Sequence, residues 1–272
     1  MKNSIIQKSY IDKENKDYIY NKLKDFEKRE NIKILHAIES GSRAWGFPSK
    51  NSDYDVRFIY SRTQQQYLSI EQPIDNIQTP IVDDQVLAAP YDLAGWDLRK
   101  ALHLILKSNA IVHEWLSSPI NYISNATFLK EVKDFYLKTS SLDSVTYHYF
   151  SIANGIWNAL LKEGKTLTVK KYLYVIRPVL CLCYIYQNKT FPPMDLYLLC
   201  NGIDVEDEII MSLKKLVDMK EKSNESDLVE RYAVLDEFIS AILAVNIDRN
   251  KTFSYSPENL QGANDIFINY FL

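Results

Sequence analysis

Residues 39–60, ESGSRAWGFPSKNSDYDVRFIY, place a Gly-Ser pair and a turn-rich loop before two aspartates that open an apolar run. Successive side chains of a strand point to opposite faces. We therefore expect Asp53, Asp55 and Arg57 on one face of a strand that begins here. The intervening side chains would face a core: Tyr54, Val56 and Phe58.

The two aspartates and the Gly-Ser pair together indicate a particular chemistry. Carboxylates two residues apart on one strand face repel each other unless a cation lies between them. Their hard oxygens suit Mg²⁺, which binds one or two carboxylates and completes its shell with substrate phosphates. Gly41 and Ser42 offer a closely approachable backbone, exposed N–H groups and a hydroxyl, which suit a phosphate. The pattern predicts a site for a metal ion and a phosphate.

The order of strand, Gly-Ser, short spacer and Asp-x-Asp resembles the nucleotidyltransferases of the DNA polymerase beta superfamily. The stretch GSRAWGFPSKNSDYDVRFIY, with DLRKAL and EWLSSP downstream, more narrowly resembles the bacterial and phage nucleotidyltransferases associated with RNA repair. This resemblance implies an α+β fold. A polymerase-beta-like mixed sheet with helices would occupy residues 1–125, and an all-helical domain that binds substrate or nucleotide would occupy residues 126–272.

The resemblance also implies a reaction, in which a nucleoside monophosphate passes from a nucleoside triphosphate such as ATP to an acceptor hydroxyl. Two Mg²⁺ ions, or Mn²⁺, would be held by the catalytic residues Asp53 and Asp55 and by a third carboxylate from a neighbouring strand. Asp92 is the candidate because it lies in a strand-like stretch, whereas Asp97 has the position of a helix N-cap. Asp97 as the ligand, and a turn role for Asp92, remain alternatives.

Contacts with the triphosphate follow from the same resemblance and fall on five residues: Gly41, Ser42, Arg43, Lys100 and Lys171. Ser42 would bind a terminal phosphate where a helix begins after the Gly-Ser pair. Arg43 would do the same or form a surface ion pair. Lys171 shares a helix face with Tyr174, three residues on. For Lys100 and Lys171, an ordinary solvated helix face is the alternative.

Two ring side chains near the motif also have alternative roles. Trp45 would either stack on a base or serve as a buried aromatic anchor for its loop. His36 lies in the strand expected over residues 31–39. We interpret it as a packed histidine rather than a ligand, because no other His or Cys lies nearby in the sequence.

Apolar periodicity predicts the remaining elements. Helices are expected over residues 12–30, from residue 98, over 111–116, 145–161, 206–222 and 226–247, and from Lys170 onward with an interruption at Pro178. Strands are expected around 66–70 and 77–82, and over 87–94, where Pro90 indicates an edge or a bulge.

Composition limits the location and the partners. No apolar run among the 272 residues is long enough to span a bilayer, and the N-terminus lacks the apolar core of a signal peptide. Cys181, Cys183 and Cys200 lack zinc-site spacing and are expected to be buried thiols. We therefore expect a cytoplasmic protein with no membrane partner.

The acceptor is left open by the sequence. An RNA or tRNA 3′ end agrees with the resemblance and with five basic residues against one acidic between Lys162 and Arg177. The net charge of −3 weighs mildly against long RNA. A protein hydroxyl, as in AMPylation, and a small molecule are chemically compatible. Two other classes compete: a non-catalytic nucleotide-binding module, and a metal-dependent phosphohydrolase or nuclease.

Overall fold

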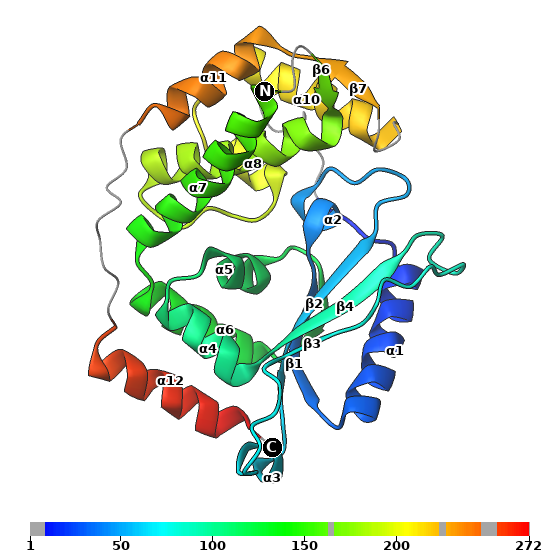
Figure 1. Cartoon of the computed structure of the whole chain (residues 1–272), viewed down its shortest axis with the longest axis vertical. Coiled ribbons are helices and arrows are strands. Elements are labelled where there is room, and N and C mark those ends of the chain that lie inside the picture. The colour runs from blue at the N-terminus through cyan, green and yellow to red at the C-terminus, as the bar shows by residue number, and fades with distance from the viewer. Residues whose placement is uncertain (1–8, 163–165, 223–226, 246–254, 272) are drawn as a thin grey trace. The chain divides into compact units, whose positions relative to one another are not determined.

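The structure of this chain, a computed structural model, describes residues 9–162, 166–222, 227–245 and 255–271 (Figure 1). Contacts within the chain divide these residues into two units. The sheet unit comprises residues 10–44, 52–141 and 255–271, and the helical unit comprises Ser9, residues 45–51 and the described residues between 142 and 245. The chain thus enters the helical unit early, through the seven residues 45–51 of the loop that follows the Gly-Ser pair.

The sheet unit is a mixed five-stranded sheet with helices, in strand order β3-β4-β2-β1-β5. Strands β2 and β4 are parallel, and the other neighbouring pairs are antiparallel. Its elements in chain order are α1 (Lys13–Glu30), β1 (Lys33–Glu39), α2 (Gly41–Trp45, which ends in the helical unit), β2 (Tyr54–Ser61), α3 (Gln64–Tyr67), β3 (Asn76–Gln78), β4 (Tyr91–Asp97), α4 (Leu98–Leu106), α5 (Ala110–Ser117), β5 (Asn121–Ser124), α6 (Ala126–Thr139) and α12 (Pro257–Tyr270). The α+β class with a mixed sheet is therefore confirmed.

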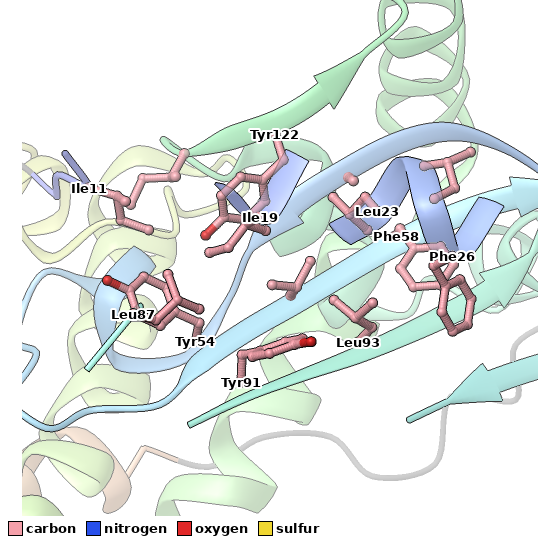
Figure 2. Packing of buried hydrophobic residues seen from close by; sticks show 14 of the residues in the cluster. Ile11, Ile19, Leu23, Phe26, Tyr54, Phe58, Leu87, Tyr91, Leu93 and Tyr122 are labelled. Carbon is pink, nitrogen blue, oxygen red and sulfur yellow. The ribbon is translucent and has the colours of Figure 1, made fainter. Parts of the chain in front are cut away.

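Helix α1 and one face of the sheet form a hydrophobic core (Figure 2). The helix begins at Asp12, whose carboxylate accepts from the Asn15 N–H. It buries Phe26, whose ring meets that of Phe58 edge-on at a centroid distance of 5.6 Å. Tyr54, Val56 and Phe58 all belong to this core. The alternation predicted for β2 is confirmed, and the side chains between them point to the opposite face of the sheet.

The prediction of a strand around residues 66–70 is wrong, because Gln64–Tyr67 form the short helix α3. Thr63 and Gln66 make a capping box: the Thr63 hydroxyl accepts from the Gln66 N–H, and the Gln66 side chain accepts from the Thr63 N–H. Two reciprocal bonds stabilise a helical turn here. The strand expected around 77–82 appears as β3 over Asn76–Gln78.

Strand β4 begins later than expected, at Tyr91, and continues to Asp97. It lies between β3 and β2 rather than at an edge. Pro90 has no N–H to give to a ladder, so it lies just before the strand, and its carbonyl accepts from the Tyr54 N–H at 2.8 Å.

The helical unit contains α7 (Leu142–Leu160), β6 (Thr166–Thr168), α8 (Val169–Asn188), α9 (Leu196–Asn201), α10 (Asp207–Lys222), β7 (Leu228–Glu230) and α11 (Ala233–Leu243). Strands β6 and β7 pair as a small antiparallel sheet, so this part is not purely helical. Helix α8 runs through Pro178 without the expected interruption. Most of its side chains from Tyr172 to Ile185 are buried, and this packing stabilises the helix despite the lost hydrogen bond. None of the described helices is long and apolar enough to cross a membrane.

The division into units differs from the boundary expected between residues 125 and 126. Helix α6 buries Phe128, Val132 and Tyr136 and packs on α4, α5 and β1, all in the sheet unit. Helix α12 packs on α4 and α6. These two helices follow the strands in sequence but complete the sheet unit through long-range contacts that periodicity does not reveal.

His36 lies in β1 with 1% of its surface exposed, and its Nε2 is 3.3 Å from the Trp115 carbonyl oxygen. It is a packed histidine, as expected. Burial lowers the pKa of His36 to about 4, because the imidazolium would lose its hydration.

This burial predicts a loss of stability in acid. Below pH 6.5 the unfolded chain binds a proton at His36 that the folded chain takes up only near pH 4. The contribution of the neutral His36 to the free energy of unfolding is therefore complete above the ordinary pKa of histidine, and it disappears as the pH falls toward 4. Between about pH 7 and pH 5 the wild type should lose about 2 kcal/mol of unfolding free energy relative to His36→Phe. Urea unfolding at both pH values checks this; parallel losses in the two proteins would contradict it.

Candidate active site

The register of β2 and β4 brings two acidic side chains together. Asp55 is paired directly with Asp92 across the parallel strands, and both point away from the α1 core. Asp53 lies just before β2 and is exposed. Asp97 is paired instead with Tyr60, five positions further along β4 than Asp92. The neighbour of Asp55 is therefore Asp92.

Asp97 is used by the fold. Its carboxylate caps α4 by accepting from the Arg99 N–H at 2.9 Å, and it accepts from the Tyr67 hydroxyl at 3.0 Å. The Arg62 Nε lies 3.7 Å from the same carboxylate. These contacts agree with the N-cap role expected from the sequence.

Arg57 lies between the paired acids and contacts both. Its Nη2 donates to Asp55 Oδ1 at 2.9 Å, and its Nη1 lies 3.1 and 3.0 Å from the two carboxylate oxygens of Asp92. Nη1 also donates to the Val56 carbonyl at 3.1 Å. The cation that the facing carboxylates require is, in this structure, a guanidinium.

The fit of a metal ion can be judged from these contacts. Among the described residues, no group of three or more His, Cys, Asp or Glu side chains is arranged to hold a metal ion. Asp55 and Asp92 nevertheless present hard carboxylate oxygens that already bind a cation, with Asp53 two residues before Asp55. The donor chemistry therefore suits Mg²⁺ or Mn²⁺ at the place that Arg57 fills.

Gly41 lies against Asp55. Its φ of +59° is in the left-handed region, and a Cβ added to it would be 1.9 Å from Asp55 Oδ2. The Ser40 N–H donates to the Asp55 carbonyl at 2.8 Å. Only glycine allows the backbone this close to the carboxylate. Ser42 follows in the first turn of α2 and is half-buried. The Gly-Ser pair and the acidic pair thus form one cluster.

Arg43 holds the segment before β2. Its Nη2 donates to the Ser52 carbonyl at 2.6 Å and its Nε to the Asp53 carbonyl at 3.2 Å. The guanidinium also lies 3.8 Å from the centre of the Tyr54 ring. These partners are backbone oxygens and a ring, rather than the carboxylate of a surface ion pair.

Neither predicted lysine belongs to the strands or the loop that form this cluster. Lys100 is in α4, beyond the far end of β4 from Asp92, and its Nζ donates to Asp75 Oδ1 at 2.9 Å. The structure does not bring it to the acidic pair. Lys171 is exposed on α8 of the helical unit, and it is Lys170 whose Nζ lies over the Tyr174 ring, at 5.9 Å. A triphosphate contact by Lys171 stays a prediction.

The loop after the Gly-Ser pair packs within the helical unit. The Trp45 ring meets Tyr174 edge-on at 5.2 Å, and the Arg177 guanidinium lies 4.5 Å from the centre of the Trp45 ring. Ser49 accepts from the buried Lys220 at 3.3 Å. Trp45 was expected either to stack on a base or to anchor its loop, and its contacts are those of an anchor.

Glu39 is a part of the site that the sequence analysis missed. It is fully buried, and its Oε1 accepts from the Asp55 N–H at 3.0 Å. Its Oε2 accepts from the Tyr122 hydroxyl at 2.6 Å. Burial raises the pKa of Glu39 to about 8, so the carboxyl is mainly protonated at neutral pH. The signal available in the sequence is an acid that ends the stretch NIKILHAIE, with one residue between it and the Gly-Ser pair.

Replacing Glu39 tests how it supports Asp55. In Glu39→Gln the amide oxygen can accept from the Asp55 N–H, and the amide nitrogen can face Tyr122, so stability and activity should stay near wild type. Glu39→Ala leaves the Asp55 N–H and the Tyr122 hydroxyl without this partner, and it should lower the free energy of unfolding by about 3 kcal/mol. Urea unfolding measures both variants. A glutamine variant as unstable as the alanine variant would show that the ionised form is needed.

Comparison with known proteins places these observations in a family. Residues 16–269 match the model of the RNA repair pathway DNA polymerase beta family (RlaP). The chain is 40% identical over 224 residues to the uncharacterized protein YcgL of Bacillus subtilis (strain 168), covering 82% of this chain and 84% of that protein. A crystal structure of a nucleotidyltransferase-like protein from Exiguobacterium sibiricum 255-15 is similar over 93% of this chain and 74% of that one, at 9% identity and a TM-score of 0.30.

The family match covers more than half of the chain, and it agrees with the Gly-Ser and Asp-x-Asp motif lying together beside a mixed sheet. The chain therefore belongs to the RNA repair pathway DNA polymerase beta family, among the nucleotidyltransferases of the DNA polymerase beta superfamily.

Proposed function

We propose that this protein is a metal-dependent nucleotidyltransferase that moves a nucleoside monophosphate from a nucleoside triphosphate to the 3′ hydroxyl of an RNA. The observation that carries this proposal is the in-register pair of Asp55 and Asp92, with the Gly41 backbone against the Asp55 carboxylate. RNA as the acceptor is supported by the family description, which names an RNA repair pathway.

The residues of the cluster would divide the work by chemistry. Asp53, Asp55 and Asp92 would hold Mg²⁺ or Mn²⁺, which when bound neutralises phosphate charge and acidifies the attacking hydroxyl. The backbone at Gly41 and the Ser42 hydroxyl would receive the phosphates. Most of the rate enhancement would come from positioning and charge neutralisation, as in phosphoryl transfer generally.

Three further contacts complete the proposal. Glu39 holds the backbone of Asp55, so it would act as a positioning residue. Arg43 fixes the carbonyls of Ser52 and Asp53, and we assign it a phosphate contact as a second role. We likewise assign Lys171 a triphosphate contact.

We also propose that the reaction takes place in the cytoplasm. The three buried free cysteines support this location, because free thiols are typical of a reducing compartment.

The test is a transfer assay on the full chain with each nucleoside triphosphate labelled at the α-phosphate, Mg²⁺ or Mn²⁺, and RNA. We expect labelled RNA and release of pyrophosphate. The matched control is the same RNA with its 3′ hydroxyl blocked, which should stay unlabelled.

Other outcomes of this assay would overturn the proposal in distinct ways. Label on a protein or a small molecule would replace the RNA acceptor. Loss of triphosphate without labelled product would indicate a phosphohydrolase. Binding of nucleotide with neither product would indicate a non-catalytic module.

A further inference from the structure

Arg57 occupies the place where a metal ion would bind. Its contacts with the two carboxylates must therefore change before a metal ion can bind there. It reaches Asp55 with one terminal nitrogen and Asp92 with the other, at 2.9 to 3.1 Å. It comes from the same strand face as Asp55, two residues on, so the two side chains are held together by the strand itself. The pair and its counter-ion are thus built into β2 and β4.

The charges show why Arg57 and a divalent cation exclude each other. Asp55, Asp92 and Arg57 together carry one net negative charge, so the acids are already half neutralised. A divalent cation between the same oxygens would lie within a few ångströms of the guanidinium, where like charges repel strongly in partly buried surroundings. The side chain of Arg57 is 21% exposed and that of Asp92 is 12% exposed, so water screens this repulsion only partly.

A triphosphate changes this balance. Its phosphates bring negative charge to the site and offer a guanidinium the two-pronged oxygen contacts that it makes with carboxylates. Arg57 could then exchange Asp92 for a phosphate oxygen and leave the carboxylates to the metal ion. Neither the bare metal nor the guanidinium would remain without a partner.

Resting on the proposed function, we propose that Arg57 makes metal binding conditional on nucleotide: it closes the Asp55–Asp92 pair to a divalent cation until a triphosphate arrives to bind the guanidinium. Arg57 is then a positioning residue that controls the order in which the site is filled. The site would take up the metal ion together with the nucleotide and bind free metal weakly.

The test measures Mn²⁺ binding by electron paramagnetic resonance of the free ion, with and without a triphosphate analogue that has a methylene group between the α and β phosphates. Samples with analogue but no protein correct for Mn²⁺ bound by the analogue alone. In the wild type, the analogue should tighten Mn²⁺ binding by about tenfold or more. In Arg57→Met, Mn²⁺ should bind without the analogue about tenfold tighter than in the wild type, and the effect of the analogue should shrink.

Arg57→Lys is the matched control, because it keeps the positive charge and should keep free Mn²⁺ binding weak. Mn²⁺ should also raise the melting temperature of Arg57→Met more than that of the wild type, since a ligand that binds the folded state stabilises it. Equal Mn²⁺ affinity in the wild type and Arg57→Met, or weaker affinity in the variant, would overturn the proposal.

The wild-type measurement decides the question even if the methionine variant does not fold. Mn²⁺ affinity that is unchanged by the analogue contradicts conditional binding directly. This failure is separate from failure of the proposed function. Labelled RNA in the transfer assay together with nucleotide-independent Mn²⁺ binding would reject the role of Arg57 and keep the nucleotidyltransferase.

Discussion

Asp55→Ala is expected to lower the rate of nucleotidyl transfer by a factor on the order of 10³ or more, because it removes half of the carboxylate pair that would hold the metal ion. The fold should persist. The Asp55 side chain is 32% exposed and forms an ion pair with Arg57, which keeps Asp92 as a partner when Asp55 is removed. Loss of a partly exposed ion pair costs about 1 kcal/mol or less. Single-turnover transfer and urea unfolding of the same preparation measure both quantities.

Asp97→Ala is the matched control for this prediction. It removes a carboxylate from the same sheet, at a position paired with Tyr60 rather than with Asp55. It should cost about 3 kcal/mol of stability, because the helix loses its N-cap and Tyr67 and Arg62 lose a buried carboxylate, and it should leave transfer measurable. Transfer by Asp55→Ala within about tenfold of the wild type would remove the acidic pair from the mechanism.

Gly41→Ala is expected to damage the site through a single methyl group. The added Cβ would lie 1.9 Å from Asp55 Oδ2 and would have to occupy a backbone with φ of +59°. Either the Asp55 carboxylate or the Gly41 backbone must move, and a displacement of about 1 Å at a reacting group can cost about 10²-fold in rate. The strained backbone should also lower the unfolding free energy by about 1–2 kcal/mol.

Gly155→Ala provides the comparison for Gly41. Gly155 lies in α7, and a Cβ added there meets nothing within 4 Å. Alanine in a helix interior is favoured over glycine by about 0.5–1 kcal/mol, so this variant should be slightly more stable and fully active. Similar transfer rates for the two alanine variants would mean that the contact between Gly41 and Asp55 does not matter for catalysis.

The sequence predicts the parts of the site that depend on local spacing. Alternation along residues 53–58 places Tyr54 in the core and Asp55 on the opposite face, and the structure confirms both. The signal for α3 is also local, a Thr63 followed three residues later by Gln66, although the strand predicted around residues 66–70 overlooks it.

Other features depend on contacts between distant segments. The contact between Arg57 and Asp92 depends on the register of β2 against β4, and the paired Asp55 and Asp92 are 37 positions apart in the sequence. The contact between Glu39 and Tyr122 joins β1 to β5. No spacing rule along the chain predicts such pairings, because register is set by the packing of the whole sheet.

The parallel pairing of β2 and β4 also determines where this chain can change in length. A one-residue slip in either strand would turn its acid from the face that carries the site to the face that packs on α1, so insertions or deletions there should destroy the site. Residues 68–72, between α3 and β3, are exposed and lie outside every strand. Relatives that differ in length should therefore gain or lose residues at such a connection. The number of residues within β2 and within β4 should stay constant.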